Sequence, residues 1–200
     1  GQRRQQATAL EQQRQERSTV LAKLQRESQD RTQALTRLRA QQAELEQLLR
    51  NLARSLRDAP APVPSGAFAA LRGKLSWPVS GTLLAQFGQL RTQGVHWEGV
   101  VIGVARGAEV RAVAAGRVVY ADWLPGLGLL AIIDHGGGYL SLYGHNDGLR
   151  RAVGDSVAPG EVIASAGDTG GSSRPELYLE IRQNGKPVDP APWFRRRTPE

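Results

Sequence analysis

No cysteine and no methionine occur among the 200 residues. The lack of cysteine excludes disulfide frameworks, cysteine-ligated zinc and thiol catalysis. No apolar run approaches the roughly 20 residues that a membrane-spanning helix needs, and the first residues lack the basic-then-apolar pattern of a signal peptide. Because the chain begins without Met and inside a helical pattern, we expect a segment of a longer protein whose export signal lies outside this sequence.

Glycine, proline and aromatic residues are missing from most of the first third of the chain. No glycine lies between Gly1 and Gly66, and the first proline is Pro60. Residues 1–57 hold 12 Lys and Arg against 6 Asp and Glu, so most of the net charge of +7 belongs to them. Without aromatic side chains to stack on bases, this basic segment is not typical of a nucleic-acid binder.

Eight leucines of residues 1–57 fall on one register of alternating three- and four-residue spacings, which also passes through Ser28, Arg31 and Gln42; such a register is the seam of a coiled coil. The members of this seam are Leu21, Leu24, Leu35, Leu38, Leu45, Leu49, Leu52 and Leu56. A helix with so few large apolar side chains cannot build a core alone. We therefore predict a coiled-coil helix over residues 1–57, the C-terminal part of a longer coiled coil, which needs a partner helix.

Residues 58–66 carry three prolines, which end a helix because proline removes a donor and clashes with the preceding turn. We expect a linker over residues 58–74, with a short regulatory helical turn at 68–74. Beyond it, β-type runs alternate with glycine turns, which predicts an all-β domain over residues 75–200. These runs cover residues 109–120, 129–134, 139–143, 162–166 and 176–182.

The last of these runs alternates strictly between polar and apolar residues. Alternation places Glu176, Tyr178, Glu180 and Arg182 on one face of a strand. The other face then carries only leucine and isoleucine. The run is therefore a strand with one face toward a core.

Zinc chemistry has few candidate ligands, because the chain holds only three histidines: His96, His135 and His145. A catalytic zinc site needs about three protein ligands. His96, Glu98 and His145 could supply them, which keeps a zinc peptidase as an alternative, although no His pair at helical or strand spacing is present. His135 lies in a glycine-rich stretch and reads as a turn residue.

Taken in order, several β-type segments resemble the LytM (lysostaphin-type) peptidase domain over residues 75–194. They are residues 107–121, 132–136, 139–145, 154–157, 160–163, 180–182 and 184–190. The resemblance implies a mainly β fold of the lysostaphin, or duplicated-hybrid-motif, type.

Active LytM members hold zinc through the His and Asp of a His-x-Gly-Ile/Val-Asp segment and the second His of a later His-x-His. At the three ligand positions this chain carries Trp97, Val101 and Tyr178. Glu176 replaces the first His of the later pair, and His145 is retained in Tyr-Gly-His. An indole and an isopropyl group offer no usable lone pair, so the resemblance implies a domain without catalysis, metal or cofactor.

Within the LytM family, the chain is most similar to the EnvC-type murein hydrolase activators, which join a coiled coil to a degenerate LytM domain. The segments that carry this likeness are residues 97–103, 121–124, 141–144 and 174–181. The resemblance implies a periplasmic activator of cell-wall zinc amidases, controlled by FtsX of the FtsEX complex through the full coiled coil. The residues expected to line a partner-binding groove are Trp97, Val101, Tyr143, His145, Arg174, Glu176 and Tyr178.

Two further hypotheses remain open beside the activator and the zinc peptidase. One is a passive peptidoglycan-binding module that the coiled coil merely positions. The other is an autoinhibited activator, in which residues 68–74 or the basic helix cover the groove.

Overall fold

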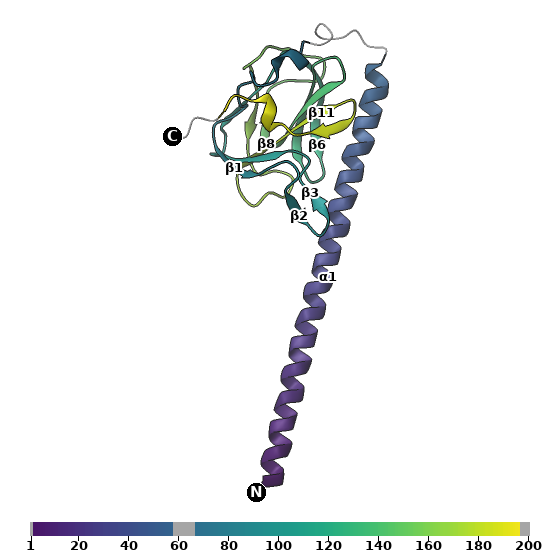
Figure 1. The fold of residues 1–200 in the computed structure, drawn as a ribbon, viewed down its shortest axis with the longest axis vertical. Helices are drawn as coiled ribbons and strands as arrows, with labels where there is room; N and C mark the ends of the chain where they lie inside the picture. Colours follow the sequence, from purple (N-terminus) through teal and green to yellow (C-terminus); the bar gives the residue numbers. More distant parts are fainter. Residues whose placement is uncertain (1, 58–66, 197–200) are drawn as a thin grey trace. The chain divides into compact units, whose positions relative to one another are not determined.

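The computed structural model describes residues 2–57 and 67–196 (Figure 1). The long helix α1 spans Gln2–Leu56 and holds neither proline nor glycine. The chain divides into two compact units, Gly1–Gln42 and Ala43–Glu200, so the last part of α1 belongs to the same unit as the strands. No helix in the described ranges is long and apolar enough to cross a membrane. Most of the linker expected at 58–74 lies outside the described residues.

In the first unit, the leucines nearest the start of the helix are open to solvent, whereas Leu35 is partly buried and Leu38 is buried. Leu10, Leu21 and Leu24 are each more than half exposed. These residues include the start of the predicted coiled-coil seam, and the packing of that seam against a partner helix stays a prediction.

The second unit is built on strands, as the sequence predicts. They are β1 (Thr82–Ala85), β2 (Leu90–Thr92), β3 (Val95–His96), β4 (Val100–Gly103), β5 (Glu109–Arg111), β6 (Gly116–Leu124), β7 (Gly128–Asp134), β8 (Tyr139–Leu149), β9 (Ser156–Val157), β10 (Val162–Ala166), β11 (Glu176–Gln183) and β12 (Lys186–Val188). Over the described residues, the main sheet runs β1-β4-β11-β8-β7-β6-β9, and its neighbouring strands are antiparallel.

One predicted run differs from the structure. The sequence suggests continuous β structure over 109–120, but the chain bends at Val113–Ala115 and makes two strands, β5 and β6, with different partners. Ala112, Val113 and Ala114 are buried in the core at this bend.

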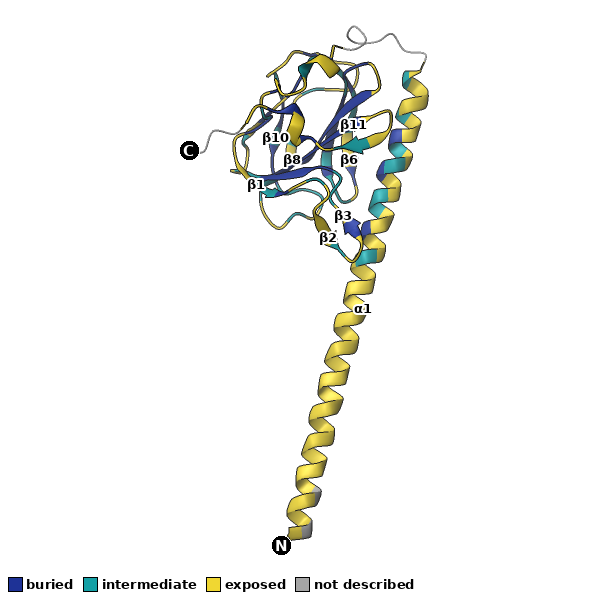
Figure 2. Cartoon of the chain, in the orientation of Figure 1, coloured by how far each residue is buried: buried dark blue, intermediate teal, exposed yellow. Residues whose placement is uncertain are grey.

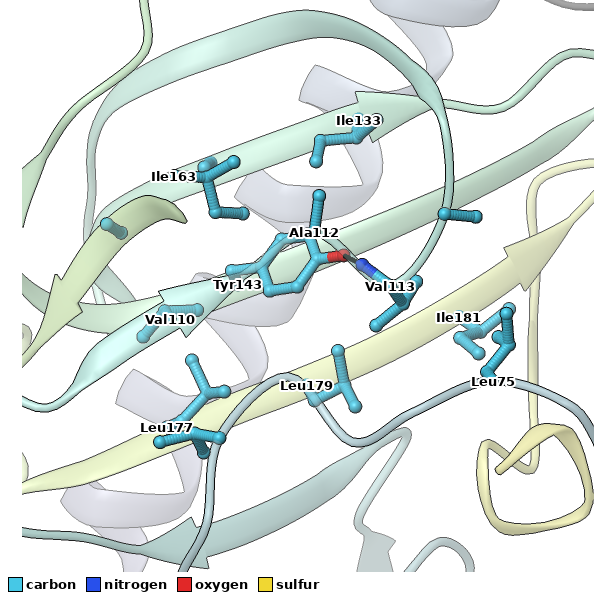
Figure 3. Close-up of a cluster of buried hydrophobic side chains, with 14 of the residues drawn as sticks. Leu75, Val110, Ala112, Val113, Ile133, Tyr143, Ile163, Leu177, Leu179 and Ile181 are labelled. Atoms are coloured by element: carbon cyan, nitrogen blue, oxygen red, sulfur yellow. Dashed lines mark hydrogen bonds between the residues drawn. The ribbon is translucent and has the colours of Figure 1, made fainter. Parts of the chain in front are cut away.

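The main core lies on one face of the sheet (Figure 3). Leu177, Leu179 and Ile181 of β11 point into it together with Ile133 of β7, which confirms the predicted alternation of β11. Tyr143 of β8 is fully buried there, and its hydroxyl accepts a hydrogen bond of 3.0 Å from the Val113 amide.

A chain of buried polar groups continues from the Tyr143 hydroxyl. The Tyr143 hydroxyl oxygen lies 3.0 Å from Ser141 Oγ, and Ser141 Oγ lies 2.7 Å from His135 Nε2. His135 Nδ1 lies 2.7 Å from the Ala115 carbonyl, so the Nδ1 proton is donated there and Nε2 accepts from Ser141. Burial lowers the pKa of His135 to about 4, which keeps the ring neutral. His135 does lie in the β7–β8 turn, as expected, but its side chain belongs to the core.

The segment after the linker packs into this same core. Phe68 is 2% exposed and stacks on His135 with ring centroids 4.6 Å apart. Its ring also contacts those of Tyr139 and Trp193. A 3-10 turn at Ala69–Leu71 follows, close to the short helical turn predicted at 68–74. The ring of Phe68 is therefore part of the domain's interior, whereas the 3-10 turn holds no buried residue.

The last part of α1 covers the other face of the sheet. Leu45 and Leu49 of α1 are buried together with a second apolar cluster from the strands, whose members are Leu124, Leu130, Ile132, Leu140 and Leu142. Within this unit, Figure 2 shows buried residues along one side of the helix. Because β7 and β8 carry apolar residues on both faces, both faces need a cover, and the helix supplies the second.

Candidate functional site

Two neighbouring strands bring the candidate site residues together. In the register of β11 with β4, Tyr178 lies opposite Val101, and in the register of β11 with β8 it lies opposite Gly144. Gly99 lets β11 approach closely, because a Cβ there would lie 2.4 Å from the Leu179 carbonyl oxygen. Two of the three positions that resemble zinc-ligand positions, Val101 and Tyr178, therefore lie side by side on β4 and β11, inside the sheet.

Apolar contacts occupy the middle of this site. Val101 and Tyr178 are buried together with Ala85 of β1, and three partly buried side chains pack beside them: Leu84, Trp97 and Leu127. We call these six residues the site cluster. The rings of Trp97 and Tyr178 are 6.2 Å apart at their centroids. The site cluster is a small apolar unit separate from the main core, and Trp97 forms its half-exposed side.

His145 borders the site cluster in a strained backbone conformation. Its φ of 65° is a left-handed value that a residue other than glycine seldom adopts. Its Nδ1 lies 2.7 Å from the Thr169 carbonyl oxygen, which orients the ring, and its Nε2 lies 3.8 Å from Glu176 Oε1. Burial lowers the pKa of His145, and its ring lies edge-on to that of Tyr178, with the centroids 6.4 Å apart.

Arg91 supplies positive charge at the same site. Its guanidinium carbon lies 4.1 Å from the centroid of the Trp97 ring, a cation–π arrangement. Burial lowers the pKa of Arg91, and the nearby Tyr178 and Glu176 act in the opposite direction. The exposed side of the site thus combines an indole, a guanidinium and a carboxylate.

Below the site cluster, Tyr178 begins a buried ionic network. Its hydroxyl donates a hydrogen bond of 2.7 Å to Glu180 Oε2. Glu180 Oε1 lies 2.7 Å from Arg182 Nε, without hydrogen-bond alignment, and Arg182 Nη2 reaches Glu98 Oε2 at 3.3 Å and Glu46 of α1. Burial raises the pKa of Glu180 to about 7. We call Glu46, Glu98, Glu180 and Arg182 the arginine cluster.

Most of the predicted groove residues lie together, with two exceptions. Trp97, Val101, His145, Glu176 and Tyr178 meet at the site, as described above. Arg174 is exposed in the loop before β11. Tyr143 lies in the main core, on the opposite face of β8.

The local structure of β8 explains why the side chains of Tyr143 and His145 lie on different faces of the sheet. Alternation would place both side chains on one face, but the pairing of β7 with β8 shifts register there, with Leu129 opposite Asn146 and Ala131 opposite Tyr143. This irregularity, together with the positive φ of His145, turns only His145 toward the site.

Sequence reasoning missed Arg91 and the arginine cluster as parts of the site. Alternation along β11 does place Glu180 and Arg182 on the Tyr178 face, which is the one signal that could have found them. The alternative zinc set is not assembled either. His96 is exposed on β3, and among the described residues no group of three or more His, Cys, Asp or Glu side chains could hold a metal ion.

The fold and the site define a class of protein. Residues 95–190 match the model of peptidase family M23, so the chain contains an M23 domain. A crystal structure of a zinc-containing peptidase from Vibrio cholerae shares the fold, with a TM-score of 0.55 and 27% identity over 59% of this chain and 39% of that one.

Two curated relatives are murein hydrolase activators. The chain is 46% identical over 132 residues to the murein hydrolase activator EnvC of Escherichia coli K12, which covers 66% of this chain and 32% of EnvC. It is 40% identical over 122 residues to the murein hydrolase activator NlpD of Salmonella typhimurium, which covers 60% of this chain and 31% of NlpD. The chain thus spans about a third of the length of these relatives.

Proposed function

We propose that this chain is a non-catalytic activator of periplasmic N-acetylmuramoyl-L-alanine amidases, the zinc enzymes that cleave the cell wall when daughter cells separate. It acts by binding a regulatory element of the amidase at the M23 site. The observation that carries the proposal is the site cluster, in which apolar packing by Trp97, Val101 and Tyr178 stands at the three ligand positions. Recruitment by FtsX through the full coiled coil stays a prediction.

The donor set at this site does not suit zinc. The indole of Trp97 and the isopropyl group of Val101 offer no usable lone pair. The Tyr178 hydroxyl donates its hydrogen bond to Glu180, and burial raises the pKa of Tyr178 well above its usual value, which disfavours the phenolate that a metal would need. No hydrolytic step through a metal-activated water follows from these residues.

The same residues suit binding. Tryptophan and arginine are enriched among the residues that anchor protein interfaces, and here Trp97 and Arg91 lie beside apolar Leu84 and Leu127. A partner element that fills this surface shifts the amidase toward its active state only if it binds that state more tightly.

The last part of α1 limits access to this face. Arg182 lies opposite Leu140, and Glu180 lies opposite Leu142, so the arginine cluster shares a face with the leucines that α1 covers. An element that extends along β11 beyond Tyr178 meets residues 43–56 of α1. This placement supports autoinhibition by the helix. It does not support residues 68–74 as the covering element, because Phe68 and Leu71 pack with the main core on the other face of the sheet.

Peptidoglycan dye release by a zinc amidase, with and without this protein, tests the proposal. We expect stimulation of the amidase and no release by the protein alone. Trp97→Ala, Arg174→Ala and Tyr178→Ala should reduce stimulation, whereas Arg111→Ala, an exposed arginine on β5, should not. Unchanged stimulation in the site variants, or dye release by the protein alone with bound zinc, would refute the proposal.

A truncation tests the autoinhibition. Removal of residues 1–56 should raise stimulation of the amidase because the covered face becomes free. The deletion must stop before Phe68, since loss of that ring would open the main core. Equal stimulation by the full and shortened chains would argue against a covering role for α1.

A further inference from the structure

The arginine cluster holds more negative than positive charge around a buried ion pair, with the side chains of Glu46 and Glu98 partly exposed. Arg182 and Glu180 on β11 are 1% and 0% exposed. Three carboxylates surround the single guanidinium, one from α1, one from the segment before β4 and one from β11 itself. With all groups ionised, the cluster carries two unbalanced negative charges.

The hydrogen bonds of the cluster leave the guanidinium incompletely paired. Arg182 Nη2 serves both Glu46 and Glu98, while Nη1 is buried without a hydrogen-bond partner among the described residues. Buried charges are stabilising only where geometry and hydrogen bonding are nearly complete. Glu46, which pairs α1 with Arg182, therefore shares this guanidinium with the carboxylates of Glu98 and Glu180.

Apolar contacts hold the helix at the same place. Leu45 and Leu49, which flank Glu46 on α1, are buried against the leucines and isoleucine of β6, β7 and β8. Burial of the leucines and attraction to Arg182 thus stabilise the docked helix. Repulsion between Glu46 and the carboxylates of Glu98 and Glu180 destabilises it.

We propose that the arginine cluster is a charge-sensitive latch: Glu46 docks residues 43–56 of α1 onto the sheet through Arg182, and ionisation of Glu180 favours release of the helix. The latch concerns the chain by itself and does not depend on the proposed amidase partner.

The direction of the pH effect follows from the groups that face Glu180. These are Tyr178 and Arg182 on β11, Glu98 before β4 and Glu46 on α1, while the facing residue of β8 is Leu142. Burial is the largest cause of the raised pKa of Glu180, and Glu46 adds to it. Release of the helix removes both effects, so the docked state binds more protons and release is favoured as pH rises through about 7.

Spin-label distances test the latch, since the chain has no native cysteine to interfere. Labels at Ala43→Cys on α1 and Ser156→Cys on β9, both exposed positions, report docked and released populations in the full chain. We expect the docked-to-released ratio to fall between pH 6 and pH 8. Over the whole interval between the two pKa values of Glu180 the fall should be on the order of tenfold for each unit by which they differ, and about tenfold of it lies between pH 6 and pH 8.

Neutral variants distinguish the latch from general pH effects. Glu180→Gln, which keeps an acceptor for Tyr178, should stay docked at both pH values, and Glu98→Gln should raise the docked fraction. Glu46→Gln should weaken the pH dependence without abolishing it, because the burial of Glu180 in the docked state remains. Glu44→Gln removes the same charge from an exposed neighbouring position and should behave as the parent. A ratio that does not change with pH in the parent, or a change that persists in Glu180→Gln, would overturn the proposal.

Discussion

Two buried groups of the strand unit should titrate with opposite effects on its stability. The pKa of His135 falls from 6.5 to about 4, and that of Glu180 rises from 4.5 to about 7, in both cases mainly through burial. A neutral buried histidine stabilises the fold above its unfolded pKa, and this stability is lost as pH falls toward 4. A neutral buried glutamic acid stabilises the fold below its unfolded pKa, and this stability is lost as pH rises through 7.

The two effects are similar in size. Each shift is about 2.5 units, which corresponds to about 3 kcal/mol of unfolding free energy. Between pH 4.5 and 6.5 the contributions of His135 and Glu180 run in opposite directions and largely cancel. Glu180→Gln removes the contribution that decreases as the pH rises. From pH 4.5 to pH 6.5 the unfolding free energy of this variant should therefore increase by about 3 kcal/mol relative to that of the parent chain.

Urea unfolding followed by tryptophan fluorescence measures this difference. All four tryptophans lie outside α1, so the signal reports the strand unit. Other titrating groups are common to both chains, so their effects cancel when the pH dependences of the unfolding free energy are compared. If parent and Glu180→Gln show parallel pH dependences from 4.5 to 6.5, the burial argument for Glu180 is wrong. NMR titration checks His135 separately, because its ring should stay neutral at pH 5.

Three other substitutions should change stability by separate routes, all measurable by the same unfolding assay. Phe68→Ala should cost about 3–5 kcal/mol, because it empties the aromatic stack in the main core; a cost below 1 kcal/mol would contradict this packing. Tyr178→Phe should cost about 1–3 kcal/mol, since it leaves the Glu180 carboxyl without its hydroxyl donor; no loss would mean that this bond does not form. Gly128→Ala should destabilise by about 1–3 kcal/mol more than Gly73→Ala, because both have positive φ but only at Gly128 would the Cβ meet Thr169, 2.1 Å from its Oγ1; equal losses would refute the steric argument.

Strand alternation made much of the fold predictable. The polar–apolar pattern of β11 assigned its two faces correctly, and glycine turns marked most strands. The break between β5 and β6 was not visible, because Val113–Ala115 are apolar residues between two β-type runs, with no proline or glycine before Gly116. Their small side chains suit a buried bend as well as a strand.

The site was predictable only where a motif marked it. Family motifs drew attention to Trp97, Val101 and Tyr178, but a motif does not give the face of a neighbouring residue, and Tyr143 proved to lie in the core. Arg91 belongs to no such motif and reaches the site through a stacking contact over Trp97. The pairing of Glu46 with Arg182 joins residues 136 positions apart, which no local pattern records.

The position of Phe68 makes the last part of α1 a tethered competitor. Only ten residues separate Arg57 from Phe68, so the end of a released helix stays within about 40 Å of its anchor. Such short tethers give effective concentrations on the order of millimolar. A free partner that binds the same face competes with the helix at this local concentration, so its apparent affinity is lower than its affinity for the uncovered face. Conditions that release the helix would therefore raise the apparent affinity of the partner without any new contact.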